Sequence, residues 1–419
     1  MFFSTTKHRN WTTVLDIGTS KILCLIVRFE ENTPVIEGMG YAPAQGIKNG
    51  AIVDLEKATT CISKALMMAE KDANRTIESV IVNISSSQLK SVHLRELVHL
   101  KGSMPITTSD VKKFVDNMIQ NYLKEQEEEI IHSFVLGYNV DGETGILDPR
   151  GLFAKKMGVH LHLITLPKSH ALNLVNVLDS CHVSIEATVA TPYASALSVL
   201  TDDEKEIGVA CVDIGAGATQ IALFLKGYLV HLGLVPMGGN VITRDIAQGL
   251  SCTLADAERL KVLNGAAFLS PKDQLERLIV PIIGENDTTA SLQIPRSDLI
   301  SIIVPRLEEI FEETEKILLS QPFYNICAGR LVLTGGTSGL SEIKEKMTAF
   351  LKASVRLGHP EKIKGLTEQL DINTFSTCIG LIKYAIIKDK AVYRYQAATQ
   401  FKQKTGIIRK IIQWFDQTF

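Results

Sequence analysis

The sequence predicts an α/β protein built from two similar halves that face each other across a cleft. A strand that ends in Asp-Ile-Gly occurs twice, as "LDIG" from Leu15 and "VDIG" from Val212. Each copy is followed by further strand-like runs and a helical pattern, and a later strand, "RLVLTGG" from Arg330, runs into a Gly-Gly turn. Because short-period repeats mark solenoids, a repeat of this length indicates duplicated domains.

Each half opens with a run of strands. In the first half "TVLDIG", "KILCLIVRF" and "VIEGMGYA" are followed by a helix over Leu55 to Ala73 and the buried strand "SVIVNIS". In the second half "IGVACVDIG", "TQIALFL" and "YLVHLGLVP" predict strands again, and "NVITRDIAQGL" opens a helix. Later helices are expected over 254–264, over 296–319 with an interruption or kink at Pro305, and over 375–387.

The first half is interrupted by an insert at about Ser85 to His162. It contains a strand pair, a helix that opens near Ser109, an acidic run from Glu125 to Glu129 and further strands. We expect the acidic run to be a solvated helix end rather than a binding site. His160 and His162 alternate along a strand, and with no third ligand nearby in the sequence they indicate one strand face rather than a metal site.

Composition narrows the class of protein. Hydrophobic residues make up 45% and charged residues 21% of the 419 residues, and the net charge of −2 gives no global field for nucleic acid. The seven cysteines are scattered without a CxxC pair, which favours a reducing compartment over disulfides or zinc. The N-terminus lacks an apolar signal core and no apolar run is long enough for a transmembrane helix, so we expect neither secretion nor membrane spanning.

The two Asp-Ile-Gly turns have the composition of phosphate-binding turns. Glycine after a strand lets backbone N–H groups approach a phosphate closely. Asp16 and Asp213, each just before its turn, are expected to face each other across the cleft and to hold Mg²⁺ through water. The candidate nucleotide-binding residues of the two turns are Gly18, Thr19, Ser20, Lys21, Gly215, Gly217, Ala218 and Thr219. A third turn, Gly335, Gly336 and Thr337, would let the backbone approach an adenosine.

These motifs carry a family resemblance. "LDIGTSK", "VDIGAGAT" and "LVLTGG" resemble the phosphate 1, phosphate 2 and adenosine motifs of the actin/Hsp70/sugar-kinase superfamily, with its duplicated ribonuclease H-like domains and an interdomain cleft for ATP and Mg²⁺. Within it the chain resembles the FtsA family of bacterial cell-division proteins over nearly its whole length. "GNVITRDIA", "DAERLKVLNG" and "VLTGG" stand in that family's order, and Glu258 and Lys261 match positions that contact ribose and base.

The resemblance implies a division into subdomains, with the insert as the FtsA-type subdomain 1C. The expected ranges are 10–84, 163–204 and 375–390 for subdomain 1A, 85–162 for subdomain 1C, 205–240 and 328–374 for subdomain 2A, 241–327 for subdomain 2B, 391–405 for a tether and 406–419 for an amphipathic membrane-targeting helix.

The second turn departs from the superfamily pattern Asp-x-Gly-Gly-Gly-Thr, because Ala216 and Ala218 replace the middle Gly and the Thr. Ala218 removes a hydroxyl that would bind phosphate, at a cost of about 1.5–3 kcal/mol, and Thr219 could partly substitute. Ala216 restricts a backbone that could require a positive φ. No residue is evident that would position an attacking water. We therefore expect nucleotide to act as a conformational ligand, with slow or absent ATPase activity and no assigned catalytic residue.

The last fourteen residues, 406–419, form an amphipathic pattern. On a helical wheel the apolar side chains fall within an arc of roughly 160°, and a helix of this length spans about 21 Å, too short to cross a bilayer but suited to its interface. Basic residues would favour anionic lipid. A helix docked on the protein's own core is the alternative. The candidate membrane residues are Ile407, Ile408, Arg409, Lys410, Ile411, Ile412, Trp414 and Phe415.

The resemblance implies a function as a structural adaptor. It implies a peripheral protein of the cytoplasmic face of the inner membrane at the division septum, which forms actin-like filaments, anchors filaments of the tubulin homologue FtsZ and recruits later division proteins. Arg296 and Arg306 are candidates for binding the FtsZ C-terminal peptide, although ordinary surface arginines are an equal reading. The alternatives are a PilM-like pilus-assembly adaptor and a sugar-type small-molecule kinase on the same fold.

Overall fold

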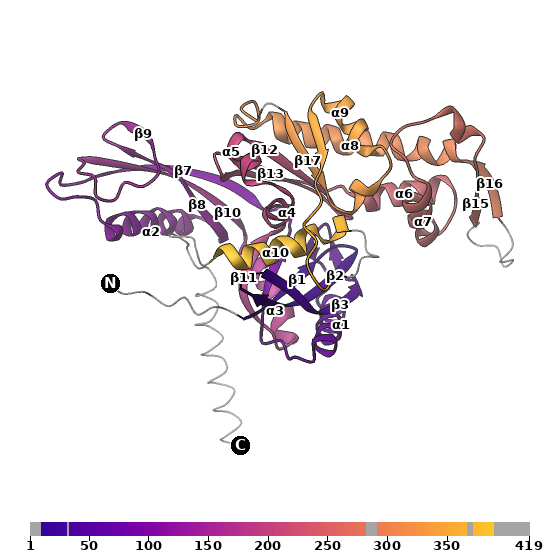
Figure 1. The fold of residues 1–419 in the computed structure, drawn as a ribbon, viewed down its shortest axis with the longest axis horizontal. Coiled ribbons are helices and arrows are strands. Elements are labelled where there is room, and N and C mark those ends of the chain that lie inside the picture. The colour runs from indigo at the N-terminus through magenta and orange to yellow at the C-terminus, as the bar shows by residue number, and fades with distance from the viewer. Residues whose placement is uncertain (1–9, 32, 282–290, 328, 367–371, 389–419) are drawn as a thin grey trace, which may run out of the picture.

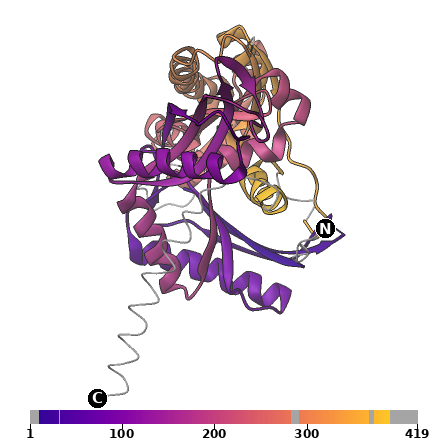
Figure 2. The same ribbon diagram turned by 90° about the vertical axis from the view of Figure 1, so that its left-hand side faces the viewer.

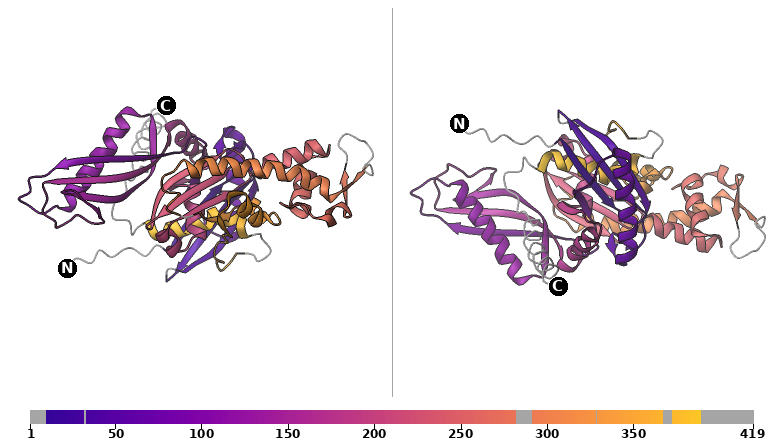
Figure 3. Two further views of the ribbon diagram at one scale, coloured as in Figure 1. Left: turned by 90° about the horizontal axis from the view of Figure 1, so that it is seen from above. Right: turned by 90° about the horizontal axis from the view of Figure 1, so that it is seen from below.

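The computed structural model describes residues 10–31, 33–281, 291–327, 329–366 and 372–388. Its two halves lie one above the other, and two smaller lobes extend to opposite ends of the molecule (Figure 1). Viewed from above and from below, the insert forms one end, and the lobe of α6 (Gly239–Gly249), α7 (Leu254–Asn264), β15 (Arg277–Pro281) and β16 (Ser291–Pro295) forms the other (Figure 3). Among the described residues no helix is long and apolar enough to span a membrane.

The sheet of the first half has the order β11-β6-β1-β2-β3. β1 pairs antiparallel with β2, which pairs antiparallel with β3, whereas β6 and β11 run parallel to β1. Its strands and helices are β1 (Trp11–Ile17), β2 (Lys21–Glu30), β3 (Thr33–Pro43), β4 (Ile47–Lys48), β5 (Ala51–Ile52), α1 (Leu55–Ala73), β6 (Ser79–Ile84), α3 (Lys168–Ser180), β11 (Ser184–Ala190) and α4 (Thr191–Val199).

The sheet of the second half, β14-β13-β12-β17-β18, repeats the same pairing pattern, with two antiparallel and two parallel neighbours. This repetition confirms the predicted duplication. Its elements are α5 (Asp202–Ile207), β12 (Val209–Ile214), β13 (Thr219–Leu225), β14 (Tyr228–Val235), β17 (Arg330–Thr334), η2 (Gly336–Gly339), α9 (Ile343–Leu351), β18 (Ser354–Leu357) and η3 (Ile372–Phe375). The chain then returns to the first half, where α10 (Ser376–Ile387) packs on α4, β1 and β6.

A lobe between β14 and β17 consists of α6 (Gly239–Gly249), α7 (Leu254–Asn264), η1 (Pro271–Gln274), β15 (Arg277–Pro281), β16 (Ser291–Pro295) and α8 (Arg296–Leu319). α8 runs through Pro305 without a break, so of the two expected outcomes the interruption is wrong and the kink stays a prediction. The buried side chains of α8, among them Ile303 and Leu307 on either side of Pro305, pack into the core of the second half. Tertiary packing therefore outweighs the one backbone hydrogen bond that proline removes.

The insert is a separate layer of β7 (Lys90–His99), α2 (Thr108–Glu125), β8 (Glu128–Val140), β9 (Glu143–Ile146) and β10 (Lys156–Pro167), with the sheet order β7-β10-β8-β9. α2 begins after a capping box formed by Thr107 and Asp110. It crosses the front of the molecule when the insert faces the viewer (Figure 2). The insert has its own core, which includes Met118, Ile119 and Leu161.

The acidic run of the insert is not simply a solvated helix end. Glu128 is only 4% exposed, and its carboxylate accepts hydrogen bonds from Lys90 Nζ, Tyr122 Oη and Thr165 Oγ1 at 2.5–2.6 Å. Glu128 therefore holds α2, β7 and β10 together. The sequence pattern missed this because a charge run shows no sign of which member turns inward.

The insert docks on β14, the edge strand of the second half. His93 Nε2 lies 2.9 Å from the carbonyl oxygen of Val230, and His162 Nδ1 lies 2.8 Å from that of Leu229. Because a carbonyl oxygen only accepts, His93 carries a proton on Nε2 and His162 carries one on Nδ1. His93 also stacks on His162 with ring centroids 4.6 Å apart. His160 and His162 lie on β10, as expected, and the described residues contain no group of three or more metal-ligating side chains.

The two halves share a continuous core. α4 and α10 pack between the two sheets. One hydrophobic cluster there contains Val14 and Leu25 of the first half and Cys211 and Phe224 of the second half. Such shared apolar burial holds the halves as one body. A cleft beside this core is lined by residues of both halves.

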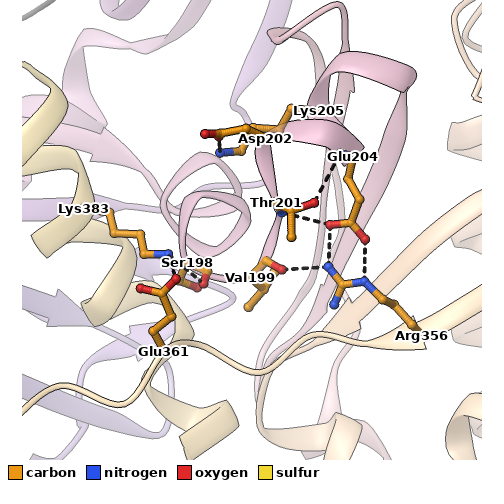
Figure 4. Close-up of polar contacts among 9 residues, drawn as sticks. All are labelled: Ser198, Val199, Thr201, Asp202, Glu204, Lys205, Arg356, Glu361 and Lys383. Carbon is orange, nitrogen blue, oxygen red and sulfur yellow. Dashed lines mark hydrogen bonds and ion pairs between the residues drawn. The ribbon is translucent and has the colours of Figure 1, made fainter.

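The chain passes from one half to the other through α5, and this connection is pinned to the last strand of the second half (Figure 4). Glu204 caps α5 together with Thr201 and also accepts two hydrogen bonds from the guanidinium of Arg356 on β18, each at 2.5 Å. Arg356 Nη2 donates to the carbonyl oxygen of Val199 at 2.8 Å as well. This bidentate pair fixes the crossing point between the halves.

Candidate functional site

The two Asp-Ile-Gly turns have the same backbone structure. Gly18 N donates to the carbonyl oxygen of Lys21 at 2.9 Å, and Gly215 N donates to that of Ala218 at 3.0 Å. Each turn joins the first two antiparallel strands of its sheet. The turns therefore occupy equivalent places in the two halves, and both line one large cleft of about 1320 Å³. That volume exceeds what a typical small-molecule site requires.

The turns come into contact across the cleft. A Cβ atom at Gly217 would lie 2.5 Å from Thr19 Oγ1 and 2.8 Å from Thr19 Cβ, so the second turn approaches the first as closely as only glycine allows. Thr19 Oγ1 also accepts a hydrogen bond from Gly50 N at 3.1 Å. A ligand with several phosphates bound here would contact both turns at once.

Two carboxylates lie at the base of the turns. Asp16 is 6% and Asp213 7% exposed, and both line the cleft. Burial raises the pKa of Asp16 to about 6, with Lys21 opposing the shift and Asp213 adding to it. Burial likewise raises the pKa of Asp213, against the hydrogen bond from Ser195 and the charge of Lys21. Two buried carboxylates that repel each other create a site where a cation is favoured.

The donor set suits magnesium rather than zinc or a caged calcium. The site offers two carboxylates with no histidine or cysteine ligand beside them, and the described residues hold no larger cluster of ligating groups. Mg²⁺ is bound in proteins by one or two carboxylates while it keeps several waters and contacts substrate phosphates. The residues present therefore fit a hydrated Mg²⁺ held with a nucleotide.

Lys21 approaches this region from the end of the first turn. Its Nζ donates to the carbonyl oxygen of Thr374 at 2.5 Å and lies 4.6 Å from the ring centroid of Phe375. Its charge nevertheless lowers the pKa of both Asp16 and Asp213. Lys21 therefore contributes positive charge at the phosphate end of the cleft while its ammonium contacts the segment before α10.

The opposite end of the cleft is formed by α7 and the Gly-Gly turn. Lys261 is 8% exposed, and its Nζ donates to Gly239 O at 3.1 Å, Thr243 Oγ1 at 2.9 Å and Glu258 Oε2 at 2.7 Å. Gly335 has φ 89° and ψ 165°, a conformation that other residues rarely adopt. The predicted ribose and base positions and the predicted adenosine turn thus line the same cleft, and Lys261 Nζ and Thr337 Oγ1 both lie beside Gly239.

The structure changes the interpretation of the second turn. Ala216 does not have a positive φ, so the expected backbone restriction at that position is wrong. Thr219 is fully buried and donates from Oγ1 to the carbonyl oxygen of Met237 at 2.8 Å. It does not line the cleft and cannot replace the hydroxyl that Ala218 lacks. Ala218 and Ala216 both line the cleft, and Ala218 presents a methyl group where the superfamily pattern has a hydroxyl.

The sequence did not indicate two residues that line the cleft, Asn83 and Gln220, or the buried Ser195 behind it. Asn83 lies at the end of β6 and donates from Nδ2 to Asp16 Oδ1 at 2.8 Å, and Ser195 on α4 donates to Asp213 Oδ2. Gln220 is the second residue of β13, donates from Nε2 to Ser85 Oγ at 3.2 Å, and has a buried Oε1 without a hydrogen-bond partner in the described part of the chain. An amide at this position is the type of group that orients a water. The one available signal in the sequence was an amide side chain within the mostly apolar run "TQIALFL".

Arg296 and Arg306 both lie on α8, but each is paired with carboxylates of its own lobe. Arg296 Nη1 lies 2.5 Å from Asp273, which is almost fully buried, and Arg306 Nε lies 2.6 Å from Asp245. Ten residues of helix separate the two arginines by about 15 Å. The predicted membrane residues 407–415 and the tether lie outside the described residues.

Comparison with known proteins agrees with this architecture. A family model described as cell division protein FtsA matches residues 210–380, and a model described as an SHS2 domain inserted in FtsA matches residues 86–165. The cell division protein FtsA of Agrobacterium fabrum is 34% identical, with 99% of this chain and 96% of the relative covered. The chain belongs to the FtsA family. The FtsA of Escherichia coli K12 is 32% identical, with 88% of this chain and 89% of the relative covered.

Solved structures show the same fold at low sequence identity. The PilM–PilN type IV pilus biogenesis complex matches with a TM-score of 0.62 at 16% identity over 88% of this chain and 97% of that chain. MreB 5 of Spiroplasma citri bound to AMPPNP matches with a TM-score of 0.56 at 12% identity over 91% of this chain and 98% of that chain. The fold is therefore actin-like, and this FtsA-family chain is an actin-like cell-division protein.

Proposed function

We propose that this FtsA-family protein binds ATP with Mg²⁺ in the cleft between its halves and uses the nucleotide as a conformational ligand. One observation carries the proposal: two equivalent glycine turns and two buried carboxylates line the same cavity. Bound Mg²⁺ would neutralise phosphate charge at Asp16 and Asp213. Because the ligand would contact both turns, its binding energy would favour the closed arrangement of the halves.

Slow or absent hydrolysis is part of this proposal. The second turn lacks a hydroxyl at Ala218, and Thr219 does not supply one because its own hydroxyl is bonded to Met237. Gln220 adds an amide that could orient a water, so the site keeps one element of a hydrolytic centre. Without the phosphate-binding hydroxyl we expect turnover to remain far below the 1 to 100 s⁻¹ that is typical of kinases.

We further propose that the protein forms filaments and tethers FtsZ filaments to the cytoplasmic face of the inner membrane at the septum, where it recruits later division proteins. The support is the FtsA family membership together with the sequence of residues 406–419. A single short helix binds a membrane weakly, so several helices on one filament would add avidity. A structure titled MamK double helical filament shares the fold, with a TM-score of 0.51.

Within this proposal the lobe of α6 to α8 receives the acidic FtsZ C-terminal peptide. The ion pairs described above alter the expected roles of the two arginines. Arg296 balances the buried Asp273, so its charge is committed to the fold. Arg306 has a side chain that is 31% exposed, between Asp245 and Glu309, and a peptide carboxylate could replace one of these partners. Arg306 is therefore the stronger candidate.

The membrane part is tested by co-sedimentation with anionic liposomes of the full chain and of a chain truncated after Thr405. We expect the full chain to sediment with the vesicles and the truncated chain to remain in solution. Circular dichroism and nucleotide affinity serve as controls that the truncated chain is folded. Equal binding of both chains would show that the terminal segment is not the membrane anchor.

A further inference from the structure

The two carboxylates of the cleft are each held by one side chain from outside the glycine turns. Asn83 is 2% exposed, and its amide makes three hydrogen bonds: Nδ2 donates to Asp16 Oδ1 at 2.8 Å and to Thr191 Oγ1 at 3.1 Å, while Oδ1 accepts from Ile17 N at 2.7 Å. Asn83 thereby fixes both the carboxylate of Asp16 and the backbone that leads into the first turn.

Ser195 holds the carboxylate of Asp213 by a hydrogen bond, as Asn83 holds that of Asp16, but Ser195 and Asp213 belong to different halves. It lies on α4 of the first half, is fully buried, and donates from Oγ to Asp213 Oδ2 of the second half at 2.5 Å. Ser195 Oγ also lies 3.0 Å from Thr377 Oγ1 on α10. The orientation of the second carboxylate therefore depends on how α4 and α10 lie against β12.

These bonds engage one oxygen of each carboxylate. Among the described residues, the second oxygen of Asp16 and that of Asp213 have no protein hydrogen-bond partner. Asp213 Oδ1 lies beside Gly335, where a Cβ atom would be only 2.2 Å away, so this oxygen is directed toward the adenosine turn rather than into the core. The arrangement is that of ligands oriented by outer hydrogen bonds, with one oxygen left for the cation or its water.

We propose that Asn83 and Ser195 are positioning residues for the Mg²⁺ of the cleft, and that Ser195 makes the metal site depend on the contact between the two halves. This inference rests on the proposed function. Asn83 and Ser195 act through the carboxylates of Asp16 and Asp213, whose orientation their hydrogen bonds fix. If the halves separate, Ser195 leaves Asp213, and the second carboxylate loses its orientation.

The test uses the full chain with Ser195→Ala and, as a matched control, Ser198→Ala one turn further along α4. Ser198 is equally buried, but its hydroxyl donates to the carbonyl oxygen of Ser195 and not to a carboxylate. ATP is titrated into each protein by calorimetry over a series of Mg²⁺ concentrations and in EDTA. The readout is the ratio of ATP affinities with and without Mg²⁺, which a purely structural role would not change.

For Ser195→Ala we expect the Mg²⁺ concentration at half-saturation to rise about 10- to 100-fold, the usual effect of removing an outer-shell partner, while the affinity in EDTA changes by less than about twofold. Ser198→Ala should behave as wild type. Ser195→Cys, which fills the same space with a weaker donor, should give an intermediate rise and serves if the alanine variant unfolds. Asn83→Ala should reproduce the effect of Ser195→Ala.

Three results would overturn the inference. An unchanged ratio for Ser195→Ala in a folded protein would show that Ser195 does not position the metal carboxylate. An equal change in Ser198→Ala would assign the effect to the packing of α4. Wild-type binding of ATP that is independent of Mg²⁺ would remove the metal site but leave the nucleotide proposal intact, whereas a wild-type chain that binds no ATP would remove both.

Discussion

Gly335→Ala is a substitution for which the structure predicts a large effect beside the carboxylate of Asp213. The backbone at Gly335 has φ 89° and ψ 165°, and such a conformation costs a residue with a side chain about 1–3 kcal/mol. The new Cβ would lie 2.2 Å from Asp213 Oδ1 and 2.7 Å from Ile214 O. An ordinary close carbon–oxygen contact is about 3.3 Å, so Asp213 would have to move by about 1 Å.

Overpacking of this kind adds about 1–3 kcal/mol, so the total loss of stability is about 2–6 kcal/mol. The neighbouring Gly336 is a matched control, because a Cβ there would meet only Thr374 Cγ2 at an ordinary 3.4 Å, and its φ is not positive. The entropy of unfolding of a chain of 419 residues is about 0.9 kcal/mol/K, so the Tm should fall by about 2–7 °C for Gly335→Ala and should not fall for Gly336→Ala in thermal unfolding. Equal Tm values for the two variants would refute this account of the turn.

Other predictions address the second turn, the peptide site and the docked insert. Ala218→Thr should tighten ATP binding by about tenfold or more, because it restores a hydrogen bond to a charged group, and unchanged affinity by calorimetry would reject our interpretation of the turn. Arg306→Glu should weaken binding of the FtsZ tail peptide in fluorescence anisotropy, while the exposed Arg277→Glu on β15 should not; equal affinities would remove Arg306 from the site. Burial lowers the pKa of His162 to about 3 in the folded protein, whereas in the unfolded chain this side chain takes up a proton below about pH 6.5. At pH 5 this difference lowers the free energy of unfolding by about 2 kcal/mol. In denaturant titrations the free energy of unfolding of His162→Asn should fall less on acidification than that of the wild type. An equal fall in both proteins would show that His162 is not the source of the pH dependence.

Much of the fold could be predicted from the sequence because local patterns and tertiary packing agree. The helices over 55–73 and 254–264 have the predicted bounds, since their apolar spacing, their caps at Asp54 and Thr253 and their buried faces favour the same structure. The duplication was visible in the repeated strand that ends in Asp-Ile-Gly, because a buried strand followed by a glycine turn is a purely local signal.

The missing parts of the site are long-range contacts. Asn83 is 67 residues from Asp16 and Ser195 is 18 residues from Asp213, and neither has a sequence neighbour that marks it as polar support for a carboxylate. Glu128 was misinterpreted for the same reason, because its partners Lys90 and Thr165 come from other strands. Single-sequence patterns report the period of burial, but not which polar groups meet across a fold.

The central claim, that the cleft between the equivalent turns is a Mg²⁺–nucleotide site, is tested most directly by determining the structure of the protein with Mg²⁺ and ADP. We expect the diphosphate between Gly18 and Gly215, the hydrated metal facing Asp16 and Asp213, and the base beside Lys261. A nucleotide bound elsewhere, or a cleft that stays empty at saturating ADP, would contradict the account.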